Sequence, residues 1–147
     1  MNNMCQISLA EDATATICRA MTGAIKPRRG EASDRVASVR EVFAHVAQMR
    51  EFCAALVASG KIHDVMELAQ GHFARGIEQR LAELPQARGI IAEQRPPLAN
   101  ALAGSLLSLL TWWINRGTPG SPEHMDDVYH RLVWSGVNSA RASLRPR

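Results

Sequence analysis

The fold of this 147-residue chain is decided by one stretch, PLANALAGSLLSLLTWWINR at Pro97–Arg116. Proline suits the first turn of a helix and Gly117 suits the position just past its end, so we expect one helix here. Two stripes along this helix are apolar, the first made of Leu98, Leu102, Leu109 and Trp112 and the second of Ala99, Ala103, Leu106, Leu110 and Trp113. A helix that is apolar nearly all round has to be covered on nearly all sides.

A third stripe of the same helix carries small or polar side chains: Ala101, Gly104, Ser108, Thr111 and Asn115. Such a stripe lets another helix backbone come close. The stretch therefore predicts a central helix whose partners come from the same chain or from a second copy of it.

Other apolar residues recur at helical spacing in four segments, which are Ser8–Ile25, Asp34–Ser59, Ile62–Leu84 and a last helix that opens at Ser121-Pro122-Glu123. The most regular of them, Asp34–Ser59, is expected to be one long helix with Gly60 as its C-terminal cap. Residues 86–95 are either a loop or a short helix. Because no segment alternates with a period of two, the sequence predicts an all-α fold of five to six helices in an antiparallel bundle. We expect two parts, an N-terminal helix and loop over residues 1–33 and a helical domain over residues 34–147.

The composition, 46% apolar and 21% charged, is that of an ordinary globular domain. The longest apolar run, at residues 98–114, is interrupted by polar residues, and the N-terminus has no cationic start followed by an apolar block. Three cysteines without C-x-x-C spacing form neither a disulfide framework nor a zinc knuckle. We therefore expect a cytoplasmic protein without a membrane segment.

The net charge of +3 is spread along the chain, with clusters only at Lys26–Arg29 and at Arg141, Arg145 and Arg147. A nucleic-acid binder usually carries a basic stripe, so charge alone does not indicate one. Those two clusters are expected to give at most a weak, salt-sensitive attraction to phosphates.

Motifs of catalysis are missing from the sequence, which has neither a glycine-rich phosphate loop nor a G-x-S-x-G elbow. The five histidines, at 45, 63, 72, 124 and 130, do not have metal-ligand spacing. Asp126 and His130 are four residues apart and either share an ion or form an ordinary exposed pair. A buried Cys53 would behave as a small hydrophobe rather than as a redox sensor. We expect no enzyme, no metal and no cofactor.

What remains is a binding function, for which two sets of residues are candidates. The first set could line a cavity for a small apolar or aromatic effector and consists of Phe43, Met49, Met66, His72, Phe73 and Trp112. The alternative is that these side chains are plain core, with His72 bonded to a backbone carbonyl. The second set could form a dimer interface and consists of Leu106, Leu110, Trp113, Tyr129, Leu132 and Val133. The alternative there is packing within one chain.

The stretch ALAGSLLSLLTWWINRGTPGSPEHMDDVYHRLVWSGV, at Ala101–Val137, resembles the closing helices of the tetracycline-repressor-like (TetR/AcrR) family of bacterial transcriptional regulators. Shared features are a small-residue Ala-Gly helix running into tryptophan, a short loop, and a helix opened by Ser-Pro-Glu. The segment Val36–Gly60 is similar to an earlier helix of that family. The resemblance covers about residues 34–140.

The resemblance implies a domain that dimerises through two late helices of each subunit and encloses an effector pocket. Family members read operator DNA with an N-terminal helix-turn-helix, and residues 1–33 contain no such motif. We therefore expect the effector-binding and dimerisation portion of a ligand-responsive repressor, a homodimer that binds operator DNA only if a helix-turn-helix is restored. The alternatives are a stand-alone helical module that heterodimerises with full-length relatives, and a simple small-molecule-binding protein.

Overall fold

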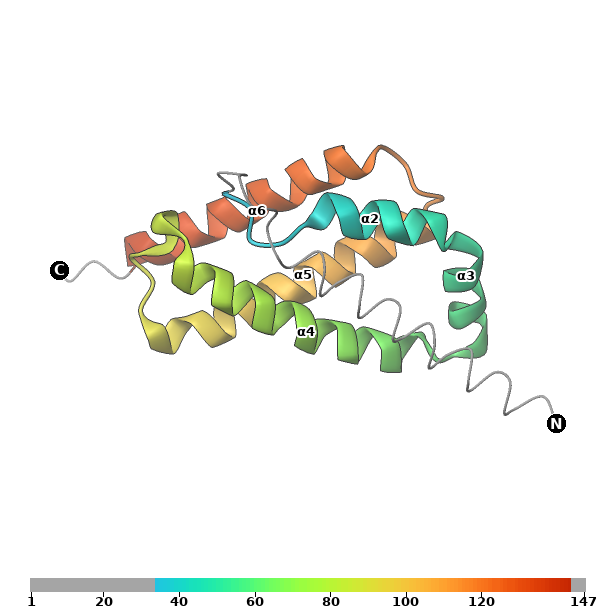
Figure 1. The fold of residues 1–147 in the computed structure, drawn as a ribbon, viewed down its shortest axis with the longest axis horizontal. Helices are drawn as coiled ribbons and strands as arrows, with labels where there is room; N and C mark the ends of the chain where they lie inside the picture. Colours follow the sequence, from blue (N-terminus) through green and yellow to red (C-terminus); the bar gives the residue numbers. More distant parts are fainter. Residues whose placement is uncertain (1–33, 144–147) are drawn as a thin grey trace.

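The computed structural model describes residues 34–143, with side chains through residue 139, and every regular element in this range is helical (Figure 1). The elements are α2 (Val39–Gln48), α3 (Arg50–Ser59), α4 (Ile62–Glu83), the 3₁₀ turns η1 (Pro85–Ala87) and η2 (Ala92–Gln94), α5 (Arg95–Asn115) and α6 (Pro122–Ser143). The predicted all-α fold is confirmed. The helix expected at Ser8–Ile25, the loop to residue 33 and the clusters Lys26–Arg29 and Arg141–Arg147 lie outside the described side chains.

The helices form two antiparallel pairs. The longer pair consists of α4 and α5, which lie side by side along most of their lengths, and α2 lies along α6 in the second pair (Figure 1). The pairs are joined by a buried hydrogen bond, in which the Tyr129 hydroxyl of α6 donates to the Leu102 carbonyl of α5 at 2.8 Å. The chain therefore has a bundle whose central member is α5.

The expectation of one long helix over Asp34–Ser59 is wrong. Residues 34–38 are not helical, and the remainder is divided at Met49, where the backbone turns and the amide N–H bonds to both the His45 and the Val46 carbonyl. From there α3 crosses the end of the bundle and connects the end of α2 to the start of α4 (Figure 1). The left-handed Gly60, with φ of +75°, ends α3 as predicted.

The other helix ends follow the local signals in the sequence. Leu84 has an extended backbone before Pro85, which ends α4, and residues 85–94 form the two short 3₁₀ turns. Gly117, with φ of +77°, follows α5. At the start of α6 the Ser121 hydroxyl oxygen accepts a hydrogen bond from the His124 amide at 3.1 Å, which caps the helix.

The centre of the core lies between α2 and α5. Phe43 and Trp113 pack edge to face there, with ring centroids 5.0 Å apart, and the Trp113 indole N–H donates to the Pro119 carbonyl at 3.0 Å. That hydrogen bond fixes the loop between α5 and α6 and satisfies the buried indole. The core is thus built around the second apolar stripe predicted for α5.

One helical segment of the described chain, residues 92–115, is long and apolar enough to cross a membrane by length and composition alone. The core helix of a soluble bundle meets the same test. Here the segment packs against α4 and contributes Ala99, Ala103, Leu106 and Trp113 to the core.

Candidate functional site

The candidate site is an apolar cavity of about 50 Å³ at the end of the bundle that α3 closes. Four helices line it, with Val42, His45 and Val46 from α2, Cys53 and Leu56 from α3, Ile62, Val65, Met66, Ala69 and Phe73 from α4, and Leu107, Leu110 and Ile114 from α5. Space for a water molecule needs only about 10–15 Å³ on this kind of measure, so the cavity is larger than one solvent site.

The break at Met49 creates this cavity. A straight continuation of α2 would carry the apolar face of residues 50–59 away from α4, whereas the bent chain turns Cys53 and Leu56 inward over the gap between α4 and α5. On its inner side the cavity is closed to solvent, because the wall residues Phe73 and Ala69 are buried there. His45, Ile62, Met66 and Ile114 are partly exposed and form the rim.

Two groups in the wall carry chemistry. The Nε2 atom of His45 is buried without a hydrogen-bond partner among the described residues. Burial raises the pKa of the Cys53 thiol, so this side chain stays protonated at neutral pH and acts as a small hydrophobe. The surface of the cavity is therefore almost entirely apolar.

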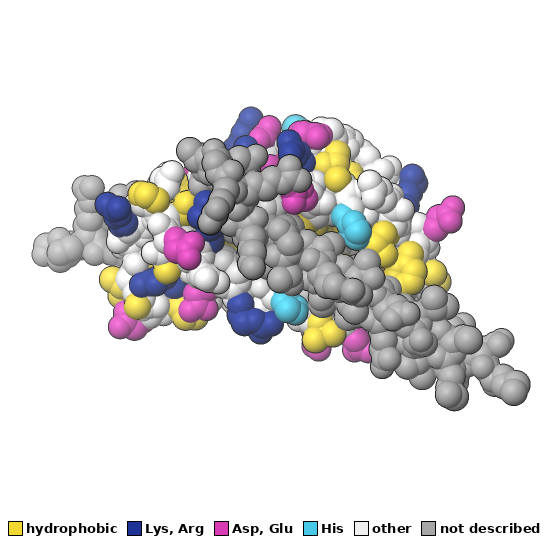
Figure 2. All heavy atoms as spheres, viewed as in Figure 1, with side chains coloured by type: hydrophobic (Ala, Val, Ile, Leu, Met, Phe, Trp, Pro, Cys, Tyr) yellow, Lys and Arg dark blue, Asp and Glu magenta, His cyan; other side chains and the backbone are white. Residues whose placement is uncertain are grey.

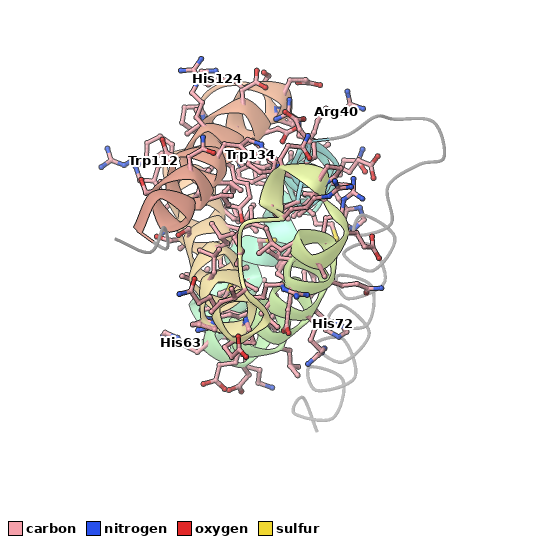
Figure 3. The ribbon with its side chains drawn as sticks, turned by 90° about the vertical axis from the view of Figure 1, so that its left-hand side faces the viewer. Arg40, His63, His72, Trp112, His124 and Trp134 are labelled. Atoms are coloured by element: carbon pink, nitrogen blue, oxygen red, sulfur yellow. The ribbon has the colours of Figure 1, made fainter. Side chains whose placement is uncertain are left out.

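Of the six residues predicted to bind a ligand, the structure places Met66 and Phe73 in the wall of the cavity. Phe43 belongs to the packed core instead, and Met49 is partly buried and packs against that core, which agrees with the alternative left open for them. His72 and Trp112 do not line the cavity either. Both are on the outside of the bundle, on different sides, and Trp112 is 47% exposed (Figure 3).

Sequence reasoning missed His45, Cys53 and Leu107 as wall residues. His45 lies in the same turn of α2 as Val46 and one turn after Val42, and all three residues line the cavity. Cys53 was predicted only to behave as a small hydrophobe if buried, and it is buried in the wall. The missing information was the bend at Met49, which no residue in the sequence signals.

A second feature is a shallow apolar groove on the surface between α5 and α6. Its residues are Gly104, Ser105, Ser108, Leu109, Trp112, Val128, Tyr129 and Leu132. Three of the large hydrophobic side chains exposed on the described part of the chain, Trp112, Val128 and Leu132, lie in this α5–α6 groove. The groove contains Gly104 and Ser108, two of the five residues of the small-residue stripe that the sequence predicted as a contact surface.

The predicted dimer-interface residues do not form one surface. Five of the six, Leu106, Leu110, Trp113, Tyr129 and Val133, are buried within the chain, and Leu110 lines the cavity. Only Leu132 is exposed, at 54%. Packing within one chain, the alternative stated for this set, holds for the five buried residues. The exposed surface next to them is instead formed by Leu109, Trp112 and Val128.

Asp126 and His130 are not the exposed pair that was one interpretation of their spacing, because His130 is only 3% exposed. The Val36 amide donates to His130 Nε2 at 3.1 Å, and His130 Nδ1 donates to an Asp126 carboxylate oxygen at 2.6 Å. Arg35 contacts the same oxygen at 3.4 Å and Asp127 at 3.2 Å. These bonds hold residues 35 and 36 against α6, a structural role.

Charges elsewhere are mixed. On the face drawn in Figure 2, the described Lys and Arg side chains are interspersed with Asp and Glu. Within the described residues no three His, Cys, Asp or Glu side chains are grouped to hold a metal ion. The cavity and the α5–α6 groove are thus two apolar features of this part of the chain that suit a binding function.

Comparisons with family models, with curated proteins and with solved structures gave no match to this chain. The resemblance to the tetracycline-repressor-like family therefore stays a prediction.

Proposed function

We propose that this chain is the effector-binding and dimerisation part of a ligand-responsive regulator of the tetracycline-repressor type. The observation that carries the proposal is the cavity between α2, α3, α4 and α5, which is apolar, closed on its inner side and bordered by partly exposed side chains at its rim. Between-helix cavities of this kind are common small-molecule sites.

The size of the cavity limits the effector. In another protein, a dry cavity of about 150 Å³ binds benzene. That volume is about three times the volume of the cavity found here. An aromatic ring therefore enters only if the rim opens, and Met66 suits this role because its unbranched side chain has three rotatable bonds and adapts to irregular spaces. Movement of α3 or of the Met66 rim on binding is the event that would be transmitted to the rest of a regulator.

Self-association through the α5–α6 groove completes the proposal. A two-fold interface sets the same surface against itself, so charges near its axis would face like charges. The described residues that line the groove include no ionisable side chain other than Tyr129, whose hydroxyl is bonded inside the chain. Gly104, Ser105 and Ser108 allow a second helix to approach closely. A second copy of this chain is the partner that such a surface fits.

Thermal unfolding with a small apolar probe tests the effector site. Toluene at ten times its Kd is expected to raise the midpoint of the purified chain by about 5 °C, from a stabilisation of about 1.4 kcal/mol. Ala69→Val places two methyl groups in the cavity and should abolish that shift, because Ala69 lines the wall. Ala54→Val makes the same change on an exposed side of α3 and should leave the shift intact. An equal shift in both variants would contradict the proposal.

A further inference from the structure

Residues 34–36, where the described chain begins, are fastened to the bundle by a set of polar contacts that we call the N-terminal anchor. Its contacts are the Val36 amide on His130 Nε2 at 3.1 Å, the Arg35 guanidinium on Asp126 and Asp127 of α6, and the Arg35 carbonyl, which accepts a hydrogen bond from Arg80 Nε of α4 at 3.2 Å. The chain before residue 34 is joined to the bundle at this point. A change in the anchor therefore acts on the attachment of that part of the chain.

The hydrogen bonds of His130 define its protonation state. A backbone N–H only donates, so Nε2, which receives the Val36 amide, is the ring nitrogen without a proton. Nδ1 carries the proton, since it lies 2.6 Å from an Asp126 carboxylate oxygen and 3.1 Å from the Asp126 carbonyl oxygen, and both of these accept. The imidazole is therefore neutral while the anchor is intact.

A second proton can enter this ring only at Nε2. There it would set two N–H donors, the imidazolium and the Val36 amide, against each other, so their hydrogen bond would be lost. His130 is only 3% exposed and Val36 only 1%, so the freed amide gains no contact with solvent unless the segment moves away from α6. Protonation thus favours movement of residues 34–36, because an unpaired buried donor costs free energy.

The carboxylate of Asp126 connects this protonation to Arg35. His130 Nδ1 and the Arg35 guanidinium contact the same Asp126 oxygen, at 2.6 and 3.4 Å, so a positive imidazolium competes with Arg35 for it. Protonation therefore strengthens the pair within α6 and weakens two contacts of residues 35 and 36 with that helix.

The remaining charged groups near His130 come from four parts of the chain. Asp34 and Asp127 pair with Arg35, Arg131 lines the same surface hollow as His130, and Arg80 on the Arg35 carbonyl contacts Glu83. On α2, Arg40 is exposed and Glu41 partly exposed, and neither lines this hollow. The Tyr129 ring packs edge to face on His130 and stays uncharged, because burial raises the pKa of its phenol.

We propose that His130 makes the N-terminal anchor sensitive to pH, because protonation at Nε2 breaks the hydrogen bond with the Val36 amide and loosens residues 34–36 from α6. Histidine is the side chain that ordinarily changes charge between about pH 5 and 8. In mildly acidic solution the chain before residue 34 is then held by fewer contacts. This inference is independent of the cavity and of the proposed function.

Nuclear magnetic resonance of the ¹⁵N-labelled full chain tests this inference without a variant. Between neutral and protonated His130, the Val36 amide should lose protection against hydrogen exchange by about tenfold or more, corrected for the intrinsic rate at each pH, as expected for one net hydrogen bond. The loss should have the same pH midpoint as the ring nitrogens of His130. The Phe73 amide in the middle of α4 should stay protected, which distinguishes release of the anchor from unfolding of the bundle.

His130→Gln supplies a side-chain oxygen that accepts from the Val36 amide but does not titrate, so the protection of Val36 should become independent of pH. His124→Gln changes an exposed histidine of the same helix and should keep the response of the unmodified chain. Constant Val36 protection while His130 titrates would overturn the inference. So would a response that persists in His130→Gln, or an imidazole that stays neutral down to the pH at which the bundle unfolds.

Discussion

The α5–α6 groove makes a quantitative prediction about Leu132. Complete burial of a leucine side chain contributes about 1.5–3 kcal/mol, and 54% of this one is exposed in the single chain. Covering it in a two-fold dimer therefore contributes about 0.8–1.6 kcal/mol in each subunit. Both copies change in Leu132→Asp, so the dimer should lose about 1.6–3.2 kcal/mol, which weakens its Kd by about 15- to 200-fold. Burial of the new carboxylates would add to this loss.

Sedimentation equilibrium between about 1 and 100 μM measures this effect. The unmodified chain should be dimeric over most of that range, and Leu132→Asp should be monomeric with unchanged helix content. Leu68→Asp is the matched control, because Leu68 on α4 is also 54% exposed but lies outside the groove. An unmodified chain that stays monomeric at 100 μM would refute the reasoning, and so would equal weakening by the control.

Three further predictions concern the single chain. Leu110→Asp should lower the free energy of unfolding by several kcal/mol in urea titrations whatever the oligomeric state, because Leu110 is buried in the cavity wall. His130→Leu deprives the Val36 amide of its acceptor and should cost about 1–3 kcal/mol, visible as a lower urea midpoint with an unchanged slope. Burial raises the pKa of the Cys53 thiol and the Tyr129 phenol, so the folded chain keeps protons that the unfolded chain releases, and stability should fall as the pH rises above about 9. A urea midpoint that is constant from pH 7 to 10.5 would contradict this last expectation.

The C-terminal ends of α4 and α5 and the start of α6 could be predicted from the sequence, because they depend on local chemistry. Pro85 removes a helical hydrogen bond, Gly117 adopts a positive φ, and the Ser121 hydroxyl caps the next helix. Each signal acts over a few residues and is independent of the remainder of the chain.

The break at Met49 could not be predicted, because its cause is tertiary. Apolar residues keep helical spacing through Val46, Met49 and Cys53, and methionine is a good helix former, so nothing local opposes a straight helix. The bend allows α3 to pack across the end of α4 and α5. The cavity, and the place of His45 in its wall, depend on that packing.

The sequence also could not predict which apolar side of α5 stays exposed. Trp112 and Trp113 are neighbours in the sequence, yet Trp112 is 47% exposed and Trp113 only 1%. Consecutive residues point about 100° apart on a helix, so the positions of α2 and α6 decide which ring is covered. The sequence showed that α5 carries more apolar stripes than one partner covers, but it did not show which stripe remains outside.

The central claim is that a small apolar molecule occupies the cavity closed by α3, and intermolecular nuclear Overhauser effects test it most directly. With methyl-labelled alanine, valine and leucine, protons of bound toluene should show cross-peaks to the methyl groups of Val65, Ala69 and Leu107, which line the wall. Cross-peaks confined to Val128 and Leu132 of the α5–α6 groove, or none at a saturating concentration of toluene, would contradict the account.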